Sequence, residues 1–185
     1  MPAGKRHADD IARLVMQAMT EECCLFLAGE GNTLDDFRAM MSELASMERS
    51  QYSFRNALVA VDGGGKVAGA CVAYPGADLR KLRAAFVEAA ATRLGRHFGR
   101  IEDEAEAGEY YIDSLAVYPQ YRRKGIGAAL LMAMAAKAKE AGLPAGLLVD
   151  ANNPNAERLY RSLGFESAGA KSWGGHHMKH LLKKL

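Results

Sequence analysis

The chain has 185 residues, of which 49% are hydrophobic and 25% are charged, and its formal net charge is +2. This length allows one domain with a substantial core and is short for two, so we expect residues 1–185 to form a single domain. The small net charge argues against a broad nucleic-acid-binding surface, and the sequence has no apolar run long enough to span a membrane.

Two helices are predicted before the first strand. The first spans about residues 8–27, after a loop or short edge-strand remnant at residues 1–4, because its apolar residues recur every three or four positions. The second follows Thr33, a good N-cap residue, and ends near residue 47. Three cysteines, with Cys23-Cys24 in the first helix, favour reduced core thiols in a cytoplasmic protein, and the N-terminus lacks a signal-peptide pattern.

A β-hairpin and a third helix are predicted next. Strands at residues 56–61 and 66–74 flank Asp62-Gly63-Gly64-Gly65, a pattern typical of an antiparallel hairpin. The helix spans residues 79–94. The acidic run at residues 102–106 indicates a solvated loop or, alternatively, a region that attracts a cationic substrate.

The most informative segment runs from Tyr110 to Leu131. Up to Val117 its aromatic and β-branched residues predict a strand, Pro119 ends that strand, and the apolar residues from Ile126 onward recur at helical spacing. A strand that leads through a glycine-containing turn into a helix presents unpaired backbone N–H groups and the positive end of a helix dipole. This segment therefore predicts an anion site that is best matched to a phosphate.

The remaining elements complete an α/β fold with a mixed sheet. A short buried strand is predicted at residues 145–149, a helix follows the cap residue Asn153, and two terminal strands begin near Phe165. On the last strand His176, Met178 and His180 share one face. We predict no metal site there, because the sequence shows no carboxylate or cysteine pattern beside these histidines.

Two segments resemble the GNAT superfamily of N-acyltransferases. Residues 122–127, Arg-Arg-Lys-Gly-Ile-Gly, carry the family's Arg/Gln-x-x-Gly-x-Gly/Ala pattern between a strand and a helix. Residues 153–165 carry its Asn-x-x-Ala-x-x-Leu-Tyr-x-x-x-Gly-Phe pattern. The resemblance implies a GNAT-like fold, with a mixed, mostly antiparallel central sheet flanked by helices, and acetyl-coenzyme A as the co-substrate.

An acyl-coenzyme A site at the turn follows from this resemblance. Four backbone amides would bind the diphosphate, the preceding cations would add charge, and the backbone of the central strand would meet the pantetheine amides. The cap residue borders the cofactor groove, and the motif tyrosine lies beside the sulfur. The expected cofactor-binding residues are Leu115, Ala116, Val117, Arg122, Arg123, Lys124, Gly125, Ile126, Gly127, Ala128, Asn153 and Tyr160.

Tyr160 and Asp113 are the expected catalytic residues. By the resemblance, Tyr160 lies where its phenol can protonate a departing thiolate, and the alternative is a core tyrosine. Asp113 precedes Leu115 by two residues and is expected on the same face of the strand, as a base for the acceptor amine. Glu109, Tyr111 and the loop carboxylates are rival bases, and the alternative role for Asp113 is that of a structural hydrogen-bonding residue.

The chain departs from the family pattern at two places. The family's first strand is nearly absent, and about thirty residues with a helix stand between the hairpin and the central strand, where the family has a short turn. We expect this insertion, about residues 78–108, to wall the acceptor site, since long structured connections are often functional. The alternative is a decorative or dimer-forming helix.

The resulting hypothesis is a cytoplasmic N-acetyltransferase that moves acetyl from acetyl-coenzyme A to a primary amine by direct attack. An acyl-enzyme route has no candidate cysteine at a motif position. The alternatives are a catalytically silent acyl-coenzyme A binding or sensor protein, and a mononucleotide-binding protein, which the turn's glycine spacing disfavours. The expected partner is a small-molecule or peptide amine, with no nucleic acid and no membrane. The oligomeric state is left open, and a homodimer is one option.

Overall fold

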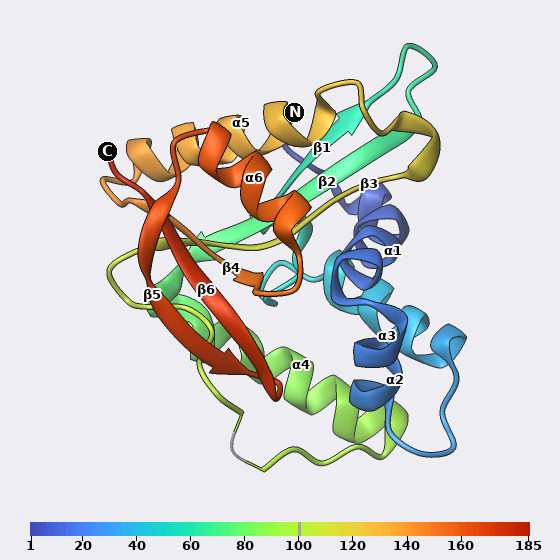
Figure 1. Cartoon of the computed structure of the whole chain (residues 1–185). Helices are drawn as coiled ribbons and strands as arrows, with labels where there is room; N and C mark the ends of the chain where they lie inside the picture. The colour runs from blue at the N-terminus through green and yellow to red at the C-terminus, as the bar shows by residue number, and fades with distance from the viewer. Residues whose placement is uncertain (100) are drawn as a thin grey trace.

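A six-stranded sheet with the order β1-β2-β3-β4-β6-β5 forms the centre of the molecule (Figure 1). The computed structural model describes residues 1–99 and 101–185. Only β3 and β4 pair in parallel among the strands described, so the predicted mixed, mostly antiparallel sheet is confirmed. The strands are β1 (Ala57–Val61), β2 (Val67–Pro75), β3 (Tyr110–Val117), β4 (Ala145–Asp150), β5 (Glu166–Trp173) and β6 (His176–Lys183).

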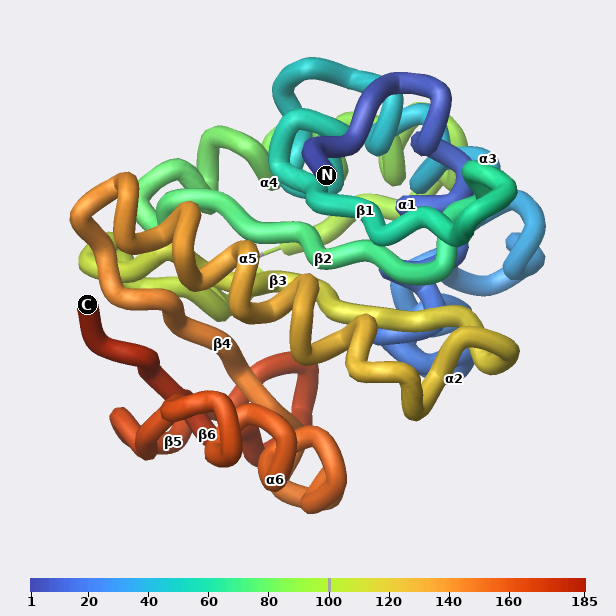
Figure 2. Tube along the Cα trace, turned by 90° about the horizontal axis from the view of Figure 1, so that it is seen from above, coloured from blue at the N-terminus to red at the C-terminus, as the bar shows by residue number. Residues whose placement is uncertain are grey.

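Helices cover both faces of this sheet (Figure 2). On one face α5 and α6 enclose a core that includes Leu131 and Met134. On the other face α1 and α3 pack with α4 around Phe37 and Leu44. The helices are α1 (Ala8–Met19), α2 (Glu21–Ala28), α3 (Leu34–Ser46), α4 (Leu79–Leu94), α5 (Ile126–Glu140) and α6 (Pro154–Ser162).

The prediction of one helix over residues 8–27 was wrong, because the helix is interrupted at Thr20. Thr20 adopts φ 78° and ψ 154°, and its Oγ1 accepts a hydrogen bond from the Cys23 N–H to begin α2. Apolar periodicity continues across such a one-residue break, so it does not reveal the break. Cys24 and Cys71 are buried as expected, whereas Cys23 is partly exposed.

Most other predicted elements lie where the sequence indicated. Thr33 and Asp36 form a capping box at the start of α3, and α4 has the predicted bounds. The first residues run beside the edge strand, where Pro2 bridges Leu58 and the Ala3 N–H donates to the Ala57 carbonyl at 3.0 Å. These contacts are those of a short edge-strand remnant.

β3 and β4 diverge after a short pairing. Their register runs only from Tyr110 opposite Ala145 to Ile112 opposite Leu147. Beyond that point β3 continues upward and to the right in Figure 1, while β4 ends near the centre. The sheet is therefore open between the second half of β3 and the end of β4.

Asp113 is the extra residue of a β-bulge in β3. Val72 pairs with Ser114 and Ala73 pairs with Ile112, so Asp113 has no partner of its own in β2. A bulge interrupts the alternation of side chains. As a result Asp113 hydrogen-bonds to Tyr74, while Leu115 packs in the core under α5, and the prediction that these two residues share a face was wrong.

The segment between β2 and β3, which contains the insertion, is fixed to the sheet at its first residue. The Gly76 N–H donates to the Glu109 carbonyl at 2.8 Å, and a Cβ on Gly76 would overlap the backbone carbonyl of Glu106. Glycine is thus required here by the close approach of two backbone segments.

Replacing Gly76 with alanine is expected to lower the free energy of unfolding by about 2 kcal/mol, because relieving the overlap requires the 104–109 loop to move. Urea denaturation measures this value. Gly108→Ala is the matched control, since its Cβ would meet no atom within 4 Å. Equal stabilities of the two variants would contradict the close approach.

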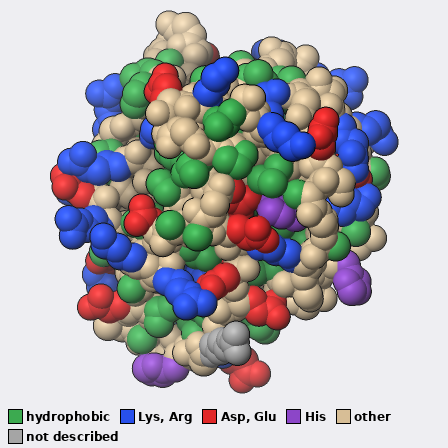
Figure 3. Space-filling model, turned by 90° about the vertical axis from the view of Figure 1, so that its left-hand side faces the viewer, with side chains coloured by type: hydrophobic (Ala, Val, Ile, Leu, Met, Phe, Trp, Pro, Cys, Tyr) green, Lys and Arg blue, Asp and Glu red, His purple; other side chains and the backbone are tan. Residues whose placement is uncertain are grey.

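Charged side chains of both signs are interspersed over the face shown in Figure 3. This distribution agrees with the net charge of +2 and with the absence of a single-sign patch on that face. None of the helices in the described ranges combines the length and the apolar character needed to cross a membrane.

Candidate active site

The turn between β3 and α5 presents a group of unpaired backbone N–H groups. Gly125 is the N-cap of α5 with φ 77°, and the first intrahelical bond runs from the Ala129 N–H to the Gly125 carbonyl at 3.0 Å. Within residues 1–99 and 101–185, the N–H groups from Gly125 to Ala128 donate to no protein acceptor. They lie at the positive end of the α5 dipole, where an anion is stabilised.

The three cations before Gly125 have different environments. The Arg122 Nε donates to the Val117 carbonyl at 3.0 Å and so holds the turn against the end of β3. Lys124 lies over the Tyr121 ring, 5.7 Å from its centroid, and Arg123 has φ 61°. Arg123 and Lys124 are exposed and therefore available to a phosphate.

Among the strands that the structure describes, none pairs with the backbone of β3 beyond Ile112 on the β4 side. The Val117 carbonyl is nevertheless engaged, because it accepts hydrogen bonds from both Gln17 Nε2 at 3.1 Å and Arg122. The Tyr118 N–H donates to the Ala68 carbonyl of β2, so by alternation the backbone of Ala116 also faces β2. Of the expected pantetheine contacts, Leu115 and the N–H of Val117 therefore face the open edge. Together with the turn amides, these donors fit a diphosphate followed by an amide-bearing arm.

Tyr160 lies on α6, on the α5 face of the sheet, with its ring centroid 6.1 Å from that of Phe165. The residue is only partly buried, and in the described part of the chain its hydroxyl has no hydrogen-bond partner. Burial raises the pKa of Tyr160 to about 12, so the phenol keeps its proton at any ordinary pH. It is available as a proton donor.

Asp113 lies on the opposite face and accepts three hydrogen bonds. Its Oδ2 accepts from Tyr74 Oη at 2.7 Å and from Gln51 Nε2 at 2.8 Å, and its Oδ1 accepts from Ser114 Oγ at 2.8 Å. The residue is partly exposed. Burial raises the pKa of Asp113 despite these hydrogen bonds, which makes the carboxylate a stronger base than a surface aspartate.

Glu104 is buried behind Asp113, so the prediction of a fully solvated acidic loop was wrong at this residue. It is 5% exposed, forms an ion pair with Arg83, and accepts a hydrogen bond from Gln51 Nε2 at 2.7 Å. Burial, followed by the charge of Asp113, raises the pKa of Glu104 to about 7.

Sequence reasoning missed Gln51, Tyr74, Arg83 and the burial of Glu104. One signal was present: Arg83 falls on the apolar stripe of α4, between Leu79 and Phe86, and it is 7% exposed. A cation on the buried side of a helix requires a buried anion to pair with it. The other residues gave no local signal.

Glu109 and Tyr111, two of the rival base candidates, are buried. Glu109 is 2% exposed, lies 2.7 Å from His180 Nε2, and accepts a hydrogen bond from the Glu106 N–H. Burial raises the pKa of Tyr111 well above its ordinary value. Neither side chain is as accessible as Asp113.

The terminal histidines do have carboxylates beside them, which the sequence pattern did not show. His176 Nδ1 lies 3.3 Å from Asp150, and His180 pairs with Glu109. Among the residues that the structure describes, however, no three potential ligands converge as a metal site requires.

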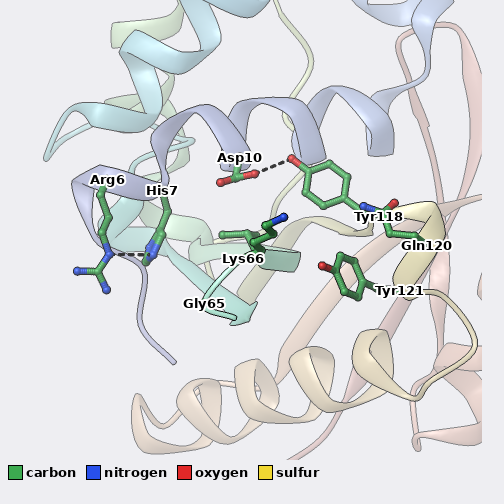
Figure 4. A pocket seen from close by; sticks show the side chains of 9 residues that line it. Arg6, His7, Asp10, Gly65, Lys66, Tyr118, Gln120 and Tyr121 are labelled. Carbon is green, nitrogen blue, oxygen red and sulfur yellow. Dashed lines mark hydrogen bonds between the residues drawn. The ribbon is translucent and has the colours of Figure 1, made fainter. Parts of the chain in front are cut away.

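A separate hollow lies between α1, the β1–β2 turn and the end of β3 (Figure 4). At the wall of this hollow Asp10 accepts a hydrogen bond from the Tyr118 hydroxyl, and nearby the Tyr121 hydroxyl donates a hydrogen bond to Asp62. The turn amides, Asp113 and Tyr160 do not line it, so it is not part of the candidate active site.

Two curated relatives share part of the sequence. The chain is 39% identical to the mycothiol acetyltransferase of Thermobispora bispora over 84 residues, which is 42% of this chain and 28% of the relative. It is 41% identical to that of Nocardiopsis dassonvillei over 66 residues, 35% of this chain and 19% of the relative. The matched stretches thus span less than a third of each relative.

Solved structures match over nearly the whole chain. The crystal structure of an acetyltransferase is 30% identical with a TM-score of 0.83, covering 100% of this chain and 97% of that one. An N-acetyltransferase from Staphylococcus aureus shares the fold, with a TM-score of 0.80 at 23% identity over 98% and 97% of the two chains. Residues 30–165 match the model of the acetyltransferase (GNAT) family. The chain therefore belongs to the GNAT family of acetyltransferases.

Proposed function

We propose that the protein is an N-acetyltransferase that moves the acetyl group of acetyl-coenzyme A to a primary amine by direct attack. The observation that supports this most is the placement of two proton-handling groups on opposite faces of the sheet. Asp113 lies on the α1 side of β3 and Tyr160 on the α5 side. Asp113 directly follows Ile112, the last residue of β3 that pairs with β4.

The turn is suited to hold the cofactor. The amides of Gly125, Ile126, Gly127 and Ala128 and the cations of Arg123 and Lys124 would bind the diphosphate, with Leu115 and the N–H of Val117 beside the pantetheine. Asn153 caps α6 through the Ala156 N–H and so positions the helix that carries Tyr160. The bound co-substrate would supply an activated thioester.

The two side chains would handle the protons of the transfer. Asp113 would accept the proton that the amine loses as its nitrogen bonds to the acetyl carbon. Tyr160 would donate its hydroxyl proton to the sulfur as the carbon–sulfur bond breaks. One proton thus passes to Asp113 and one leaves Tyr160, and exchange with water returns both groups to their starting states.

Direct attack is favoured over an acyl-enzyme because the cysteines are poor nucleophiles. Burial raises the pKa of both Cys24 and Cys71 to about 12, and burial also raises the pKa of Cys23. A thiol must be a thiolate to attack a thioester. At neutral pH these thiols stay protonated.

The acceptor is proposed to be a small amine-bearing molecule, since the curated relatives are named mycothiol acetyltransferases. A role for the insertion on the acceptor side is supported by Glu104 and Arg83, which belong to the insertion and lie close to Asp113. A panel of chemically varied amines, followed by release of the coenzyme A thiol, tests this function. Coenzyme A binding without acetyl transfer to any amine would favour a silent binding protein.

Charge reversal at the turn is expected to weaken coenzyme A binding. Lys124→Glu should lower the affinity measured by calorimetry by about tenfold, because it places an anion beside the diphosphate. Lys139→Glu, at the other end of α5, is the matched control. Equal affinities of the two variants, or stabilisation of the protein by ATP as strong as by coenzyme A, would contradict the assignment of the turn.

A further inference from the structure

A buried polar cluster lies behind Asp113 and joins parts of the chain that are far apart in sequence. It consists of Gln51, Tyr74, Arg83 and Glu104, and Asp113 is its exposed end. Gln51 is 4% exposed and Tyr74 is fully buried. The cluster thus connects the segment after α3, β2, the α4 insertion and β3.

Gln51 is the centre of the cluster, because its amide nitrogen bridges the two carboxylates. Gln51 Nε2 donates to Asp113 Oδ2 at 2.8 Å and to Glu104 Oε1 at 2.7 Å. A side-chain amide has two N–H groups, so each carboxylate can receive one. Removing either carboxylate would remove one of these two hydrogen bonds, while the contact of Gln51 Nε2 with Tyr74 Oη at 3.0 Å would remain.

Further contacts fix the positions of both Gln51 and Glu104. Asn56 Nδ2 donates to the Gln51 carbonyl at 3.2 Å and to the Ser50 carbonyl at 3.0 Å, which fixes the segment before β1. Arg83 pairs with Glu104 and with Asp103 at 3.2 Å, and Lys171 Nζ of β5 lies 3.4 Å from the Glu104 carbonyl. Three separate elements therefore fix the position of Glu104.

The charges around Asp113 do not cancel fully. Arg83 is the buried cation, whereas Asp113, Glu104 and the partly exposed Asp103 are acids. The neighbouring titratable groups on β2, β3 and the segment before β1 are neutral phenols and a thiol: Tyr52, Cys71, Tyr74 and Tyr111. Above about pH 7, where Glu104 is ionised, its charge should hold a proton on Asp113 more strongly.

We propose that Glu104 is a positioning residue for Asp113, acting through Gln51, and that its negative charge makes Asp113 a stronger base. The proposal rests on the proposed function, in which Asp113 accepts the proton of the amine. In this proposal the α4 insertion has a role in the reaction, because it supplies the carboxylate of Glu104 and the paired cation of Arg83, which set the basicity of Asp113 on β3.

The direct test is a carbon-detected NMR titration of the carboxyl groups, with Asp113→Asn used to assign the Asp113 signal. In the wild-type protein the two acids should titrate in coupled steps, the upper one at about pH 7. In Glu104→Gln, which keeps the shape and removes the charge, the step near pH 7 should vanish and the Asp113 signal should titrate in one step instead of two.

Two further variants keep the result interpretable. Arg83→Gln combined with Glu104→Gln removes both buried charges, so it avoids an unpaired arginine if the single variant folds poorly. Glu106→Gln removes a carboxylate of the same loop that pairs with Lys171 at the surface, and it should leave the Asp113 titration unchanged. An Asp113 titration in Glu104→Gln that matches the one in Glu106→Gln would overturn the proposal, whether or not the protein is active.

Kinetics separates this proposal from the proposed function. In Glu104→Gln, kcat/KM should fall about tenfold on its plateau and lose its dependence near pH 7, with coenzyme A affinity unchanged. If wild type is active, Asp113→Asn is not, and Glu104→Gln keeps the wild-type pH profile, the inference fails and the function stands. If no amine is acetylated by the wild type, the function fails, and the titration alone decides the role of Glu104.

Discussion

Asp113→Asn is expected to lower kcat by about 10²–10⁴-fold, because it removes the group that accepts the proton of the amine. Asparagine has nearly the same shape, and its amide oxygen can still accept from Tyr74 or Gln51, so the fold should persist. Thiol release under saturating acetyl-coenzyme A measures the loss. Coenzyme A affinity should be unchanged, since Asp113 lies away from the turn.

The dependence on pH identifies the role of Asp113 more sharply than the rate alone. Burial raises the pKa of Asp113, so wild-type activity should fall as the pH drops and Asp113 becomes protonated. In Asp113→Asn that fall should disappear. The loss of rate in Asp113→Asn relative to wild type should also become smaller as the pH rises toward the pKa of the acceptor amine, because more of the amine is then already neutral.

Asp35→Asn serves as the control, since Asp35 is an exposed acid on α3 that pairs only with Arg38 among the described residues. It should keep the wild-type rate and pH profile. An Asp113→Asn enzyme with full activity below neutral pH would show that Asp113 is a structural hydrogen-bonding residue, and would move the search for the base to another acid.

The parts of the site that rest on local chain signals were predictable from the sequence. Thr33 and Asn153 act as helix caps through their own side chains, and Gly125 ends the turn with a left-handed φ. Each of these depends on a few consecutive residues. Local patterns therefore located the turn and Tyr160 within the fold.

The surroundings of Asp113 were not predictable, because they depend on contacts between distant segments. The bulge at Asp113 is a property of the pairing of β2 with β3, and no residue type within β3 indicates it in the sequence. The burial of Glu104 depends on Gln51, which lies 53 positions away, and on Arg83. An acidic run has the same composition whether it is solvated or folded against a helix.

Tyr160→Phe is expected to lower kcat by about 10²-fold while leaving coenzyme A affinity and the acceptor KM nearly unchanged, because it removes only the proton donated to the departing thiolate. The fold should tolerate the change, since the Tyr160 hydroxyl has no hydrogen-bond partner within the described residues. Thiol release and calorimetry with coenzyme A measure the two quantities. Tyr110→Phe, a buried tyrosine in the same core, is the matched control and should keep the wild-type rate.

The two catalytic variants should differ in their response to pH. The pKa of Tyr160 is about 12, so the phenol stays protonated through the whole assay range and Tyr160→Phe should lose the same factor at every pH. Asp113→Asn should lose a factor that shrinks as the pH rises. If the Tyr160→Phe deficit instead varied with pH in step with Asp113→Asn, the two groups would not act on separate protons, and the assignment of base and acid to opposite faces of the sheet would be wrong.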